Sequence, residues 1–241
     1  MENSIYLGLS RQMVLRNNMT TIANNIANMT TPGYRGQHML FSEYMTKPRG
    51  AEDRLSFVYD RGQYMSAQEG PMQQTDNPFD VALVGQGFFA VQTQAGDTAY
   101  SRAGNFRLGQ DGTLQTQAGD QVLDAGGAPI AIPAEANRII FDRNGVISTE
   151  DGQIGQLQIV EFENIQELRQ FGDNLYITDA APLPPQRTTV QQGYLEGSNV
   201  NSILEMTNMI EVSRSYQSMQ QALQQENERL RNAIQKLTRA G

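Results

Sequence analysis

The chain has 241 residues, and 26 acidic against 18 basic residues give it a formal net charge of -8. This length suits one mid-sized domain or two small ones. The acidic balance argues against a dedicated nucleic-acid binder, which usually carries a clustered basic face. The absence of cysteine excludes disulfides and thiol chemistry. No apolar run approaches the ~20 residues that a membrane span needs.

The first helix is predicted within residues 1–35, where apolar side chains recur at alternating steps of three and four. The positions taken as its seam are Leu15, Met19, Ile22, Ile26 and Met29. This spacing is typical of a coiled coil rather than of the broad stripe of an ordinary surface helix. The helix is expected to end near Met29, because Thr31 precedes Pro32 and is pushed toward extended geometry.

Three asparagines, Asn24, Asn25 and Asn28, crowd the last turns of this helix. Asparagine is a middling helix former but a good partner for backbone groups at helix ends. One interpretation is therefore simple helix termination. The other is that the amides hydrogen-bond across a helix–helix contact and fix its register. The sequence does not decide between them.

Residues 36–70 are interpreted as an extended linker, with a small hairpin that pairs Phe57–Tyr59 with Gln63–Met65 around a turn. An ordinary surface loop is the alternative. The segment contains His38, the one histidine of the chain. With no second histidine and no cysteine, a zinc site is disfavoured. We therefore interpret His38 as a surface or packing residue.

The central zone, residues 71–194, is predicted to be an antiparallel β domain of short strands split by turns. The expected strands are Phe79–Val84, Gly87–Gln92, Thr113–Thr116, Gln121–Asp124, Arg138–Asp142, Gly145–Thr149, Gln156–Phe162 and Leu175–Thr178. The pairs Asp111-Gly112, Asn144-Gly145 and Asp151-Gly152 predict type I′ hairpin turns. Residues 111–119 and 144–152 echo each other as turn, strand and turn, which indicates two similar hairpins.

The second helix is predicted within residues 195–241, since neither proline nor glycine occurs between Ser198 and Ala240. Asn199 or Asn201 is expected to cap its start. Its seam comprises Met209, Val212, Tyr216, Met219, Leu223, Leu230 and Leu237. The simplest arrangement pairs the two terminal helices as a coiled-coil-like layer. Packing of both helices on the β zone is the alternative. The predicted fold class is thus α+β.

The sequence offers poor material for an active site. No G-x-S-x-G element is present for a serine hydrolase, and Gly85-Gln86-Gly87 lacks the third glycine of a dinucleotide loop. No calcium-loop spacing occurs among the acidic residues. We therefore expect no catalytic, metal or cofactor site, and we interpret the chain as a structural protein rather than an enzyme.

Four blocks, in order along nearly the whole chain, resemble the signatures of one protein family. They comprise Ala23–Arg35, Thr75–Phe89, Tyr100–Phe106, and Leu195–Asn201 with the following Glu205–Tyr216. The residues that carry the resemblance are Asn24, Asn25, Asn28, Pro32, Gly33, Tyr34, Gly87, Phe88, Phe89, Arg102, Gly104, Phe106, Glu196, Ser198, Asn199 and Val200. In this combination they resemble the rod and hook axial proteins of the bacterial flagellum.

The resemblance implies a structural subunit of the proximal rod that polymerises through its terminal helices into a torque-transmitting shaft. A distal rod or hook-type protein is the alternative, and a monomeric β-domain module that binds cell wall is a remote one. The implied partners are copies of itself, other rod proteins and, in transit, the flagellar type III export apparatus, with no cofactor. Residues 1–16 do not resemble a cleaved signal peptide, so composition alone predicts a cytoplasmic protein. The resemblance implies instead export to the periplasm with an uncleaved N-terminus.

Overall fold

The computed structural model describes residues 2–46, 55–133, 135–136 and 138–239. Two helices and a largely antiparallel set of strands make up an α+β fold, as predicted. The chain forms two compact units. Unit 1 comprises residues 1–27, 37–64 and 201–241, and unit 2 comprises residues 28–36 and 65–200. Each unit therefore joins segments that lie far apart in the sequence.

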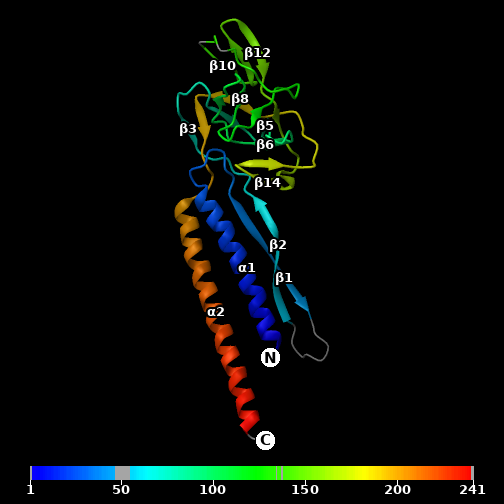
Figure 1. Ribbon diagram of the computed structural model, residues 1–241, viewed down its shortest axis with the longest axis vertical. Helices are drawn as coiled ribbons and strands as arrows, with labels where there is room; N and C mark the ends of the chain where they lie inside the picture. Colours follow the sequence, from blue (N-terminus) through cyan, green and yellow to red (C-terminus); the bar gives the residue numbers. More distant parts are fainter. Residues whose placement is uncertain (1, 47–54, 134, 137, 240–241) are drawn as a thin grey trace. The chain divides into compact units, whose positions relative to one another are not determined.

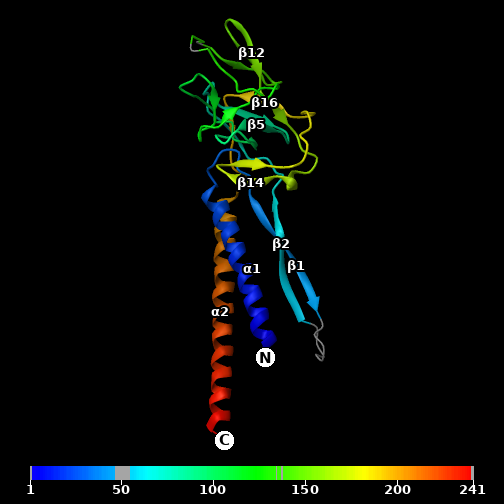
Figure 2. The same cartoon turned by 45° about the vertical axis from the view of Figure 1, so that its right-hand side comes forward.

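Unit 1 contains α1 (Glu2–Ala27), α2 (Ser202–Arg239) and the paired strands β1 (Gln37–Thr46) and β2 (Leu55–Met65). Within this unit α1 contacts both α2 and β1. Figures 1 and 2 show α1 between the longer α2 on one side and the two strands on the other. Among the described residues, no helix has the length and apolar character needed to cross a membrane.

The start of α2 is capped as the sequence predicts. The side-chain oxygen of Asn201 accepts hydrogen bonds from the backbone N–H groups of Ile203 and Leu204, at 3.1 and 3.2 Å. These bonds satisfy two of the donors that a helix leaves unpaired at its first turn. Of the two asparagines considered, Asn201 is thus the cap.

Two boundaries differ from expectation. The helix α1 ends at Ala27, short of Met29, and residues 28–30 form a turn. The small hairpin expected within residues 57–65 is not formed, because β2 runs unbroken through Asp60-Arg61-Gly62 and pairs with β1. Gly62 has a φ of 131°, a value that glycine adopts without reversing the chain.

Unit 2 is built from short strands and one short 3₁₀ helix. The elements are β3 (Met72–Gln74), β4 (Val81–Val84), β5 (Phe88–Gln92), β6 (Thr98–Ser101), β7 (Arg107–Leu108), β8 (Leu114–Gln115), β9 (Gln121–Val122), β10 (Ile140–Phe141), β11 (Val146–Thr149), β12 (Gly152–Gln156), β13 (Ile159–Val160), η1 (Ile165–Glu167), β14 (Arg169–Gly172), β15 (Leu175–Ile177), β16 (Thr189–Gln192) and β17 (Tyr194–Glu196).

The main sheet of unit 2 has the order β14-β15-β6-β5-β9-β8-β7, with β13 also paired to β5. Smaller sheets are β10-β11-β12, β16-β4 and β17-β3. Alternate residues of a strand point to opposite faces. Accordingly Phe89 and Val91 enter one apolar core, whereas Phe88 and Ala90 enter a second. The strand β5 is therefore buried on both faces.

The turns of unit 2 are tight, but they are not the type I′ turns that the sequence predicted. That type needs a positive φ at both central residues. Gly112 and Gly145 have φ values of 75° and 78°, whereas Asp111 and Asn144 are not among the residues with positive φ. The hairpin β11–β12 turns at Glu150-Asp151, since Thr149 pairs with Gly152. The echo itself holds, because β8–β9 and β11–β12 are both antiparallel hairpins.

Candidate functional site

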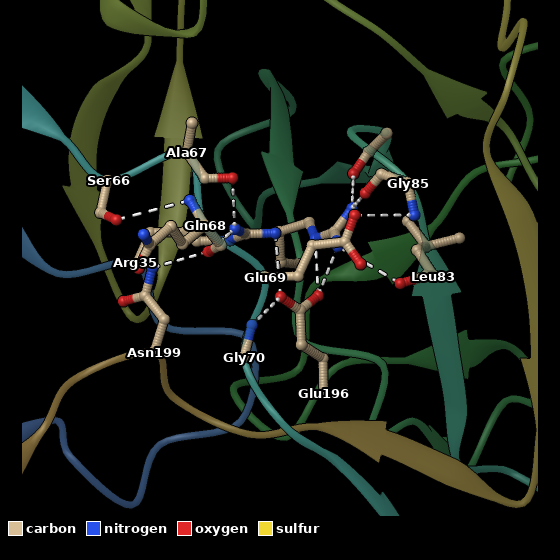
Figure 3. Close-up of polar contacts among 12 residues, drawn as sticks. Arg35, Ser66, Ala67, Gln68, Glu69, Gly70, Leu83, Gly85, Glu196 and Asn199 are labelled. Carbon is tan, nitrogen blue, oxygen red and sulfur yellow. Dashed lines mark hydrogen bonds and ion pairs between the residues drawn. The ribbon is translucent and has the colours of Figure 1, made fainter.

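Three buried charged residues, Arg35, Arg102 and Glu196, form a bonded cluster in unit 2. Arg35 Nη2 forms an ion pair with Glu196 Oε1 at 2.9 Å. Arg102 Nε donates a hydrogen bond to Glu196 Oε2 at 2.8 Å. Their side chains are almost completely excluded from solvent. Figure 3 shows the Glu196 carboxylate below Arg35 and the neighbouring chain segments. Burial of charges is costly unless each is paired and hydrogen-bonded, so the remaining contacts of the cluster decide its stability.

The guanidinium of Arg102 donates hydrogen bonds to oxygen atoms of two segments, residues 83–87 and Glu196. Besides Glu196, it donates to the carbonyl oxygens of Leu83, Gly85 and Gly87. Its central carbon lies 5.8 Å from the centroid of the Phe88 ring, within the range of a cation–π contact. The planar fork of arginine suits such a site, because it directs several donors in fixed directions at once.

Glu196 also ties together segments that lie at the borders of unit 2 in the sequence. Its Oε1 accepts the N–H of Gly70 at 3.0 Å, and its backbone carbonyl accepts the N–H of Gly33 at 2.7 Å. Residues 33–36 follow α1 in the chain, and residues 196–200 precede α2. The cluster therefore holds the two chain segments through which unit 2 is connected to the terminal helices.

Arg35 completes this junction. Its Nη1 donates to the carbonyl oxygens of Ala67 and Gln68, while its buried Nε has no hydrogen-bond partner among the described residues. Burial and the nearby Arg102 lower the pKa of Arg35, whereas Glu196 and Glu69 raise it. Burial also raises the pKa of the neighbouring Tyr176 to about 12. The raised pKa favours the neutral phenol of Tyr176 near neutral pH.

The structure brings most of the predicted motif residues together. Pro32, Gly33, Tyr34, Gly87, Phe88, Phe89, Arg102, Gly104, Phe106, Glu196, Ser198, Asn199 and Val200 all lie in unit 2, buried or half-buried. Asn199 accepts the N–H of Gly36 at 2.7 Å and donates to the carbonyl of Gln68 at 2.7 Å. Sequence reasoning missed the role of Arg35, although it lies within the first motif. Its partner lies 161 positions further along the chain, so no local spacing indicated the pair.

In unit 1 a buried asparagine links three elements. Asn25 of α1 exchanges two hydrogen bonds with the backbone of Gln37 in β1, at 2.8 and 3.0 Å. Its amide also donates to the carboxylate of Glu205 in α2 at 3.3 Å. Asn25 therefore makes the predicted bond across a helix contact. Asn28 instead supports the turn after the helix, where it accepts Thr31 Oγ1 at 3.1 Å, and Asn24 is exposed. Both interpretations of the asparagines thus apply, to different residues.

The predicted seam residues occupy the following positions. Leu15, Met19, Ile26, Met209, Val212, Tyr216, Met219, Leu223 and Leu230 are half-buried, and Ile22 is buried. Met29 lies beyond the end of α1 and is exposed, so it does not belong to the seam. The side chain of Leu237 lies outside the described residues. A closely packed position is Gly8, where an added Cβ would be 2.6 Å from Cδ2 of Leu223.

Replacing Gly8 with leucine is expected to weaken the packing of α1 on α2, because the new side chain would occupy the volume of Leu223. We expect a smaller helical signal in far-UV circular dichroism and faster proteolysis of residues 1–27. The compensating pair Gly8→Leu with Leu223→Ala restores the volume and should recover much of both signals. Equal effects of the single and double variants would contradict this packing.

Outside the packed faces, both helices expose large apolar side chains at steps of three and four. On α1 these are Tyr6, Leu9 and Met13, with exposed fractions of 63, 49 and 61%. On α2 they are Ile203, Met206 and Ile210, with 77, 47 and 53%, while Leu204, 57% exposed, lies beside Ile203 but off this spacing. We call these sets the α1 stripe and the α2 stripe. Scattered apolar residues are normal on a surface, but contiguous sets indicate interaction sites.

The described residues provide no evident reaction centre. Within that part of the chain, no group of three or more His, Cys, Asp or Glu side chains is placed to hold a metal ion. A cleft of about 470 Å³ in unit 2 is lined mainly by amide and hydroxyl side chains. His38 lies against Tyr64, with ring centroids 5.3 Å apart, in agreement with a packing role.

Comparison with known proteins decides the family. Residues 5–35 match the model described as flagella basal body rod protein, residues 82–149 that of the flagellar hook protein FlgE/F/G D1 domain, and residues 191–236 that of the flagellar basal body rod FlgEFG protein C-terminal. The flagellar basal-body rod protein FlgF of Caulobacter vibrioides is 36% identical over 242 residues, which cover 98% of each chain. This chain belongs to the flagellar basal-body rod protein family.

Other members of the rod protein family are similarly related. FlgF of Rhizobium meliloti is 32% identical over 98% of each chain. FlgG of Agrobacterium fabrum is 35% identical over 83% of this chain and 86% of its own. The function of the chain is accordingly structural rather than enzymatic, as a subunit of the flagellar rod. The resemblance inferred from the sequence motifs is confirmed.

Proposed function

We propose that this rod subunit assembles through its terminal helices, which pair as a coiled-coil-like layer and use their outer faces to contact neighbouring subunits. The α2 stripe is the observation that carries this proposal. With 100° per residue, Ile203, Met206 and Ile210 lie roughly opposite the half-buried row that begins with Met209 and Val212. The helix α2 therefore has two apolar faces, and α1 covers only one of them.

The remaining outer face of α2 supports an interface of limited length. Beyond Ile210 the corresponding positions are Arg214, Gln217, Gln221 and Gln224, all exposed and polar. The apolar part of this face spans only about two helical turns. It therefore suits a local contact with one neighbouring subunit. Burial of such side chains between subunits would stabilise assembly by roughly 25 cal/mol per Å² of apolar surface removed from water.

The triple variant Ile203→Ser, Met206→Ser and Ile210→Ser is expected to remain folded but to be lost from isolated basal bodies, with swimming abolished. Immunoblots of the basal-body fraction and swimming assays measure this. The matched control carries Gln217→Ser, Gln221→Ser and Gln224→Ser, which impose at least as large a helix-propensity cost on the same face. Normal incorporation of the first variant would contradict the proposal, as would equal loss of the control.

We further infer that the subunit acts in the proximal rod, within the periplasmic space, after export by the flagellar type III apparatus without cleavage of its N-terminus. The packing of Gly8 near Met219 and Leu223 supports an intact N-terminus, because a leader of 15–30 residues would include most of α1. Intact-mass spectrometry of the subunit from purified basal bodies tests this. A mass lacking these residues would overturn it.

A further inference from the structure

The α1 stripe and the α2 stripe have the same form. Tyr6, Leu9 and Met13 follow the spacing i, i+3, i+7, and so do Ile203, Met206 and Ile210. On a helix this spacing aligns three side chains along one face. Each stripe ends where polar residues begin, at Asn17 and Thr20 on α1 and at Arg214 and Gln217 on α2. The chain thus exposes two apolar ridges of equal length.

The two stripes lie at opposite ends of the helix pair. Gly8 packs near Leu223, whereas Asn25 bonds to Glu205, so α1 and α2 run antiparallel. The α1 stripe is therefore level with the residues around position 222 of α2. The α2 stripe lies some fifteen residues away, or roughly 23 Å along the axis at 1.5 Å per residue. Within one subunit the α1 stripe and the α2 stripe are therefore too far apart to pack against each other.

We propose that the α1 stripe of one subunit packs against the α2 stripe of a second copy of this chain. This inference rests on the proposed function and specifies its partner surfaces. In this arrangement the helices in contact run antiparallel, so successive copies keep the same orientation. Each copy is displaced from the last by roughly 23 Å along the helix axis. Such a heterologous contact leaves one stripe free at each end of the assembly, and it extends without closing.

The size of the stripes favours assembly over a stable dimer. Three side chains on each partner bury roughly 600 Å² in total, at about 100 Å² for each apolar side chain. A stable specific interface usually buries at least ~1,200 Å². A single contact is therefore weak, and it becomes persistent only where neighbouring contacts in a polymer add to it.

Cysteine cross-linking tests the pairing, because the chain has no cysteine of its own. Full-length Leu9→Cys and Met206→Cys chains are mixed under mild oxidation, with each chain alone as reference. We expect disulfide-linked dimers in the mixture, at least tenfold more than in either chain alone. The control Gln217→Cys, on the same face but outside the stripe, should not cross-link to Leu9→Cys. The double variant Leu9→Cys with Met206→Cys should give a ladder of oligomers.

Three results would overturn the inference. They are cross-linking of Leu9→Cys with itself, a double variant that stops at the dimer, and a mixture that forms no disulfide. The first would indicate two α1 stripes in contact, and the second a closed pair. The proposed function is judged separately, by the triple serine variant. If that variant is lost from basal bodies while the mixture fails to cross-link, the helices assemble but not through this pairing.

Discussion

Replacing Glu196 with glutamine is expected to lower the free energy of unfolding of unit 2 by about 3–5 kcal/mol. The substitution keeps the shape of the side chain but removes the negative charge between Arg35 and Arg102. Both guanidinium groups would then stay buried without a compensating carboxylate. Urea unfolding of the full chain measures the loss, with tyrosine fluorescence as the signal, because Tyr34, Tyr100 and Tyr176 are buried in this unit.

An exposed ion pair in the same unit provides the matched control. Arg169 and Asp179 lie 3.2 Å apart, with 68 and 97% of their side chains accessible. Such pairs contribute about 0–1 kcal/mol, so Asp179→Asn should leave the urea midpoint almost unchanged. A similar shift for Glu196→Gln and Asp179→Asn would show that the buried cluster has no special role.

A third variant separates the energetic cost of burying charged groups from the contribution of the hydrogen bonds that these groups make. Changing Arg35 and Arg102 to methionine together with Glu196→Leu removes all three charges and keeps apolar volume. Buried ion clusters replaced in this way often lose little stability. We expect the triple variant to be more stable than Glu196→Gln alone. A triple variant as unstable as the single one would indicate that the hydrogen bonds to Leu83, Gly85 and Gly70 dominate instead.

Helix patterning could be predicted from the sequence because the helix period repeats locally. The rows of α2, its long uninterrupted course and its Asn201 cap all follow from residues within a few turns of one another. The strands around Phe89 and Ile147 were likewise predicted, since they are short apolar runs between turn residues. Their pairing order was not predicted, because sheet neighbours such as β5 and β13 are far apart in the chain.

The cluster of Arg35, Arg102 and Glu196 could not be predicted from neighbouring residues either, because its members are far apart in the chain. Each residue alone resembles an ordinary surface charge, and charged residues are mostly exposed. Only the fold brings them together and removes water from them. The long course of β2 was also not predicted. The Asp60-Arg61-Gly62 sequence resembles a turn, and this signal was given more weight than the β-type residues on either side of it.

Substituting alanine for Gly33 is the second change with a large expected effect, about 2–4 kcal/mol on unit 2. Gly33 has a φ of 68°, which disfavours any side chain. An added Cβ would also collide with the backbone of Arg102 and Ala103. This collision would displace Arg102 from the carbonyl oxygens and the carboxylate that it binds, so the ion cluster and the chain turn would fail together.

Three further glycines of unit 2 separate the two causes of this loss. Gly127 has a φ of 81° with nothing within 4 Å of an added Cβ, so Gly127→Ala should show backbone strain alone. At Gly104 an added Cβ would meet the carbonyl oxygen of Val81, and Gly104 has no positive φ, so Gly104→Ala should show collision alone. Gly155 has neither feature, and its substitution should be neutral.

The same urea titration compares all four alanine variants. If strain and collision act independently, the loss for Gly33→Ala should approach the sum of those for Gly127→Ala and Gly104→Ala. A larger loss would mean that the collision also breaks the Arg102–Glu196 contact. In that case adding Glu196→Gln to Gly33→Ala should cost much less than it does in the unaltered chain. Full additivity of those two substitutions would instead show that the turn at Gly33 and the ion cluster are energetically separate.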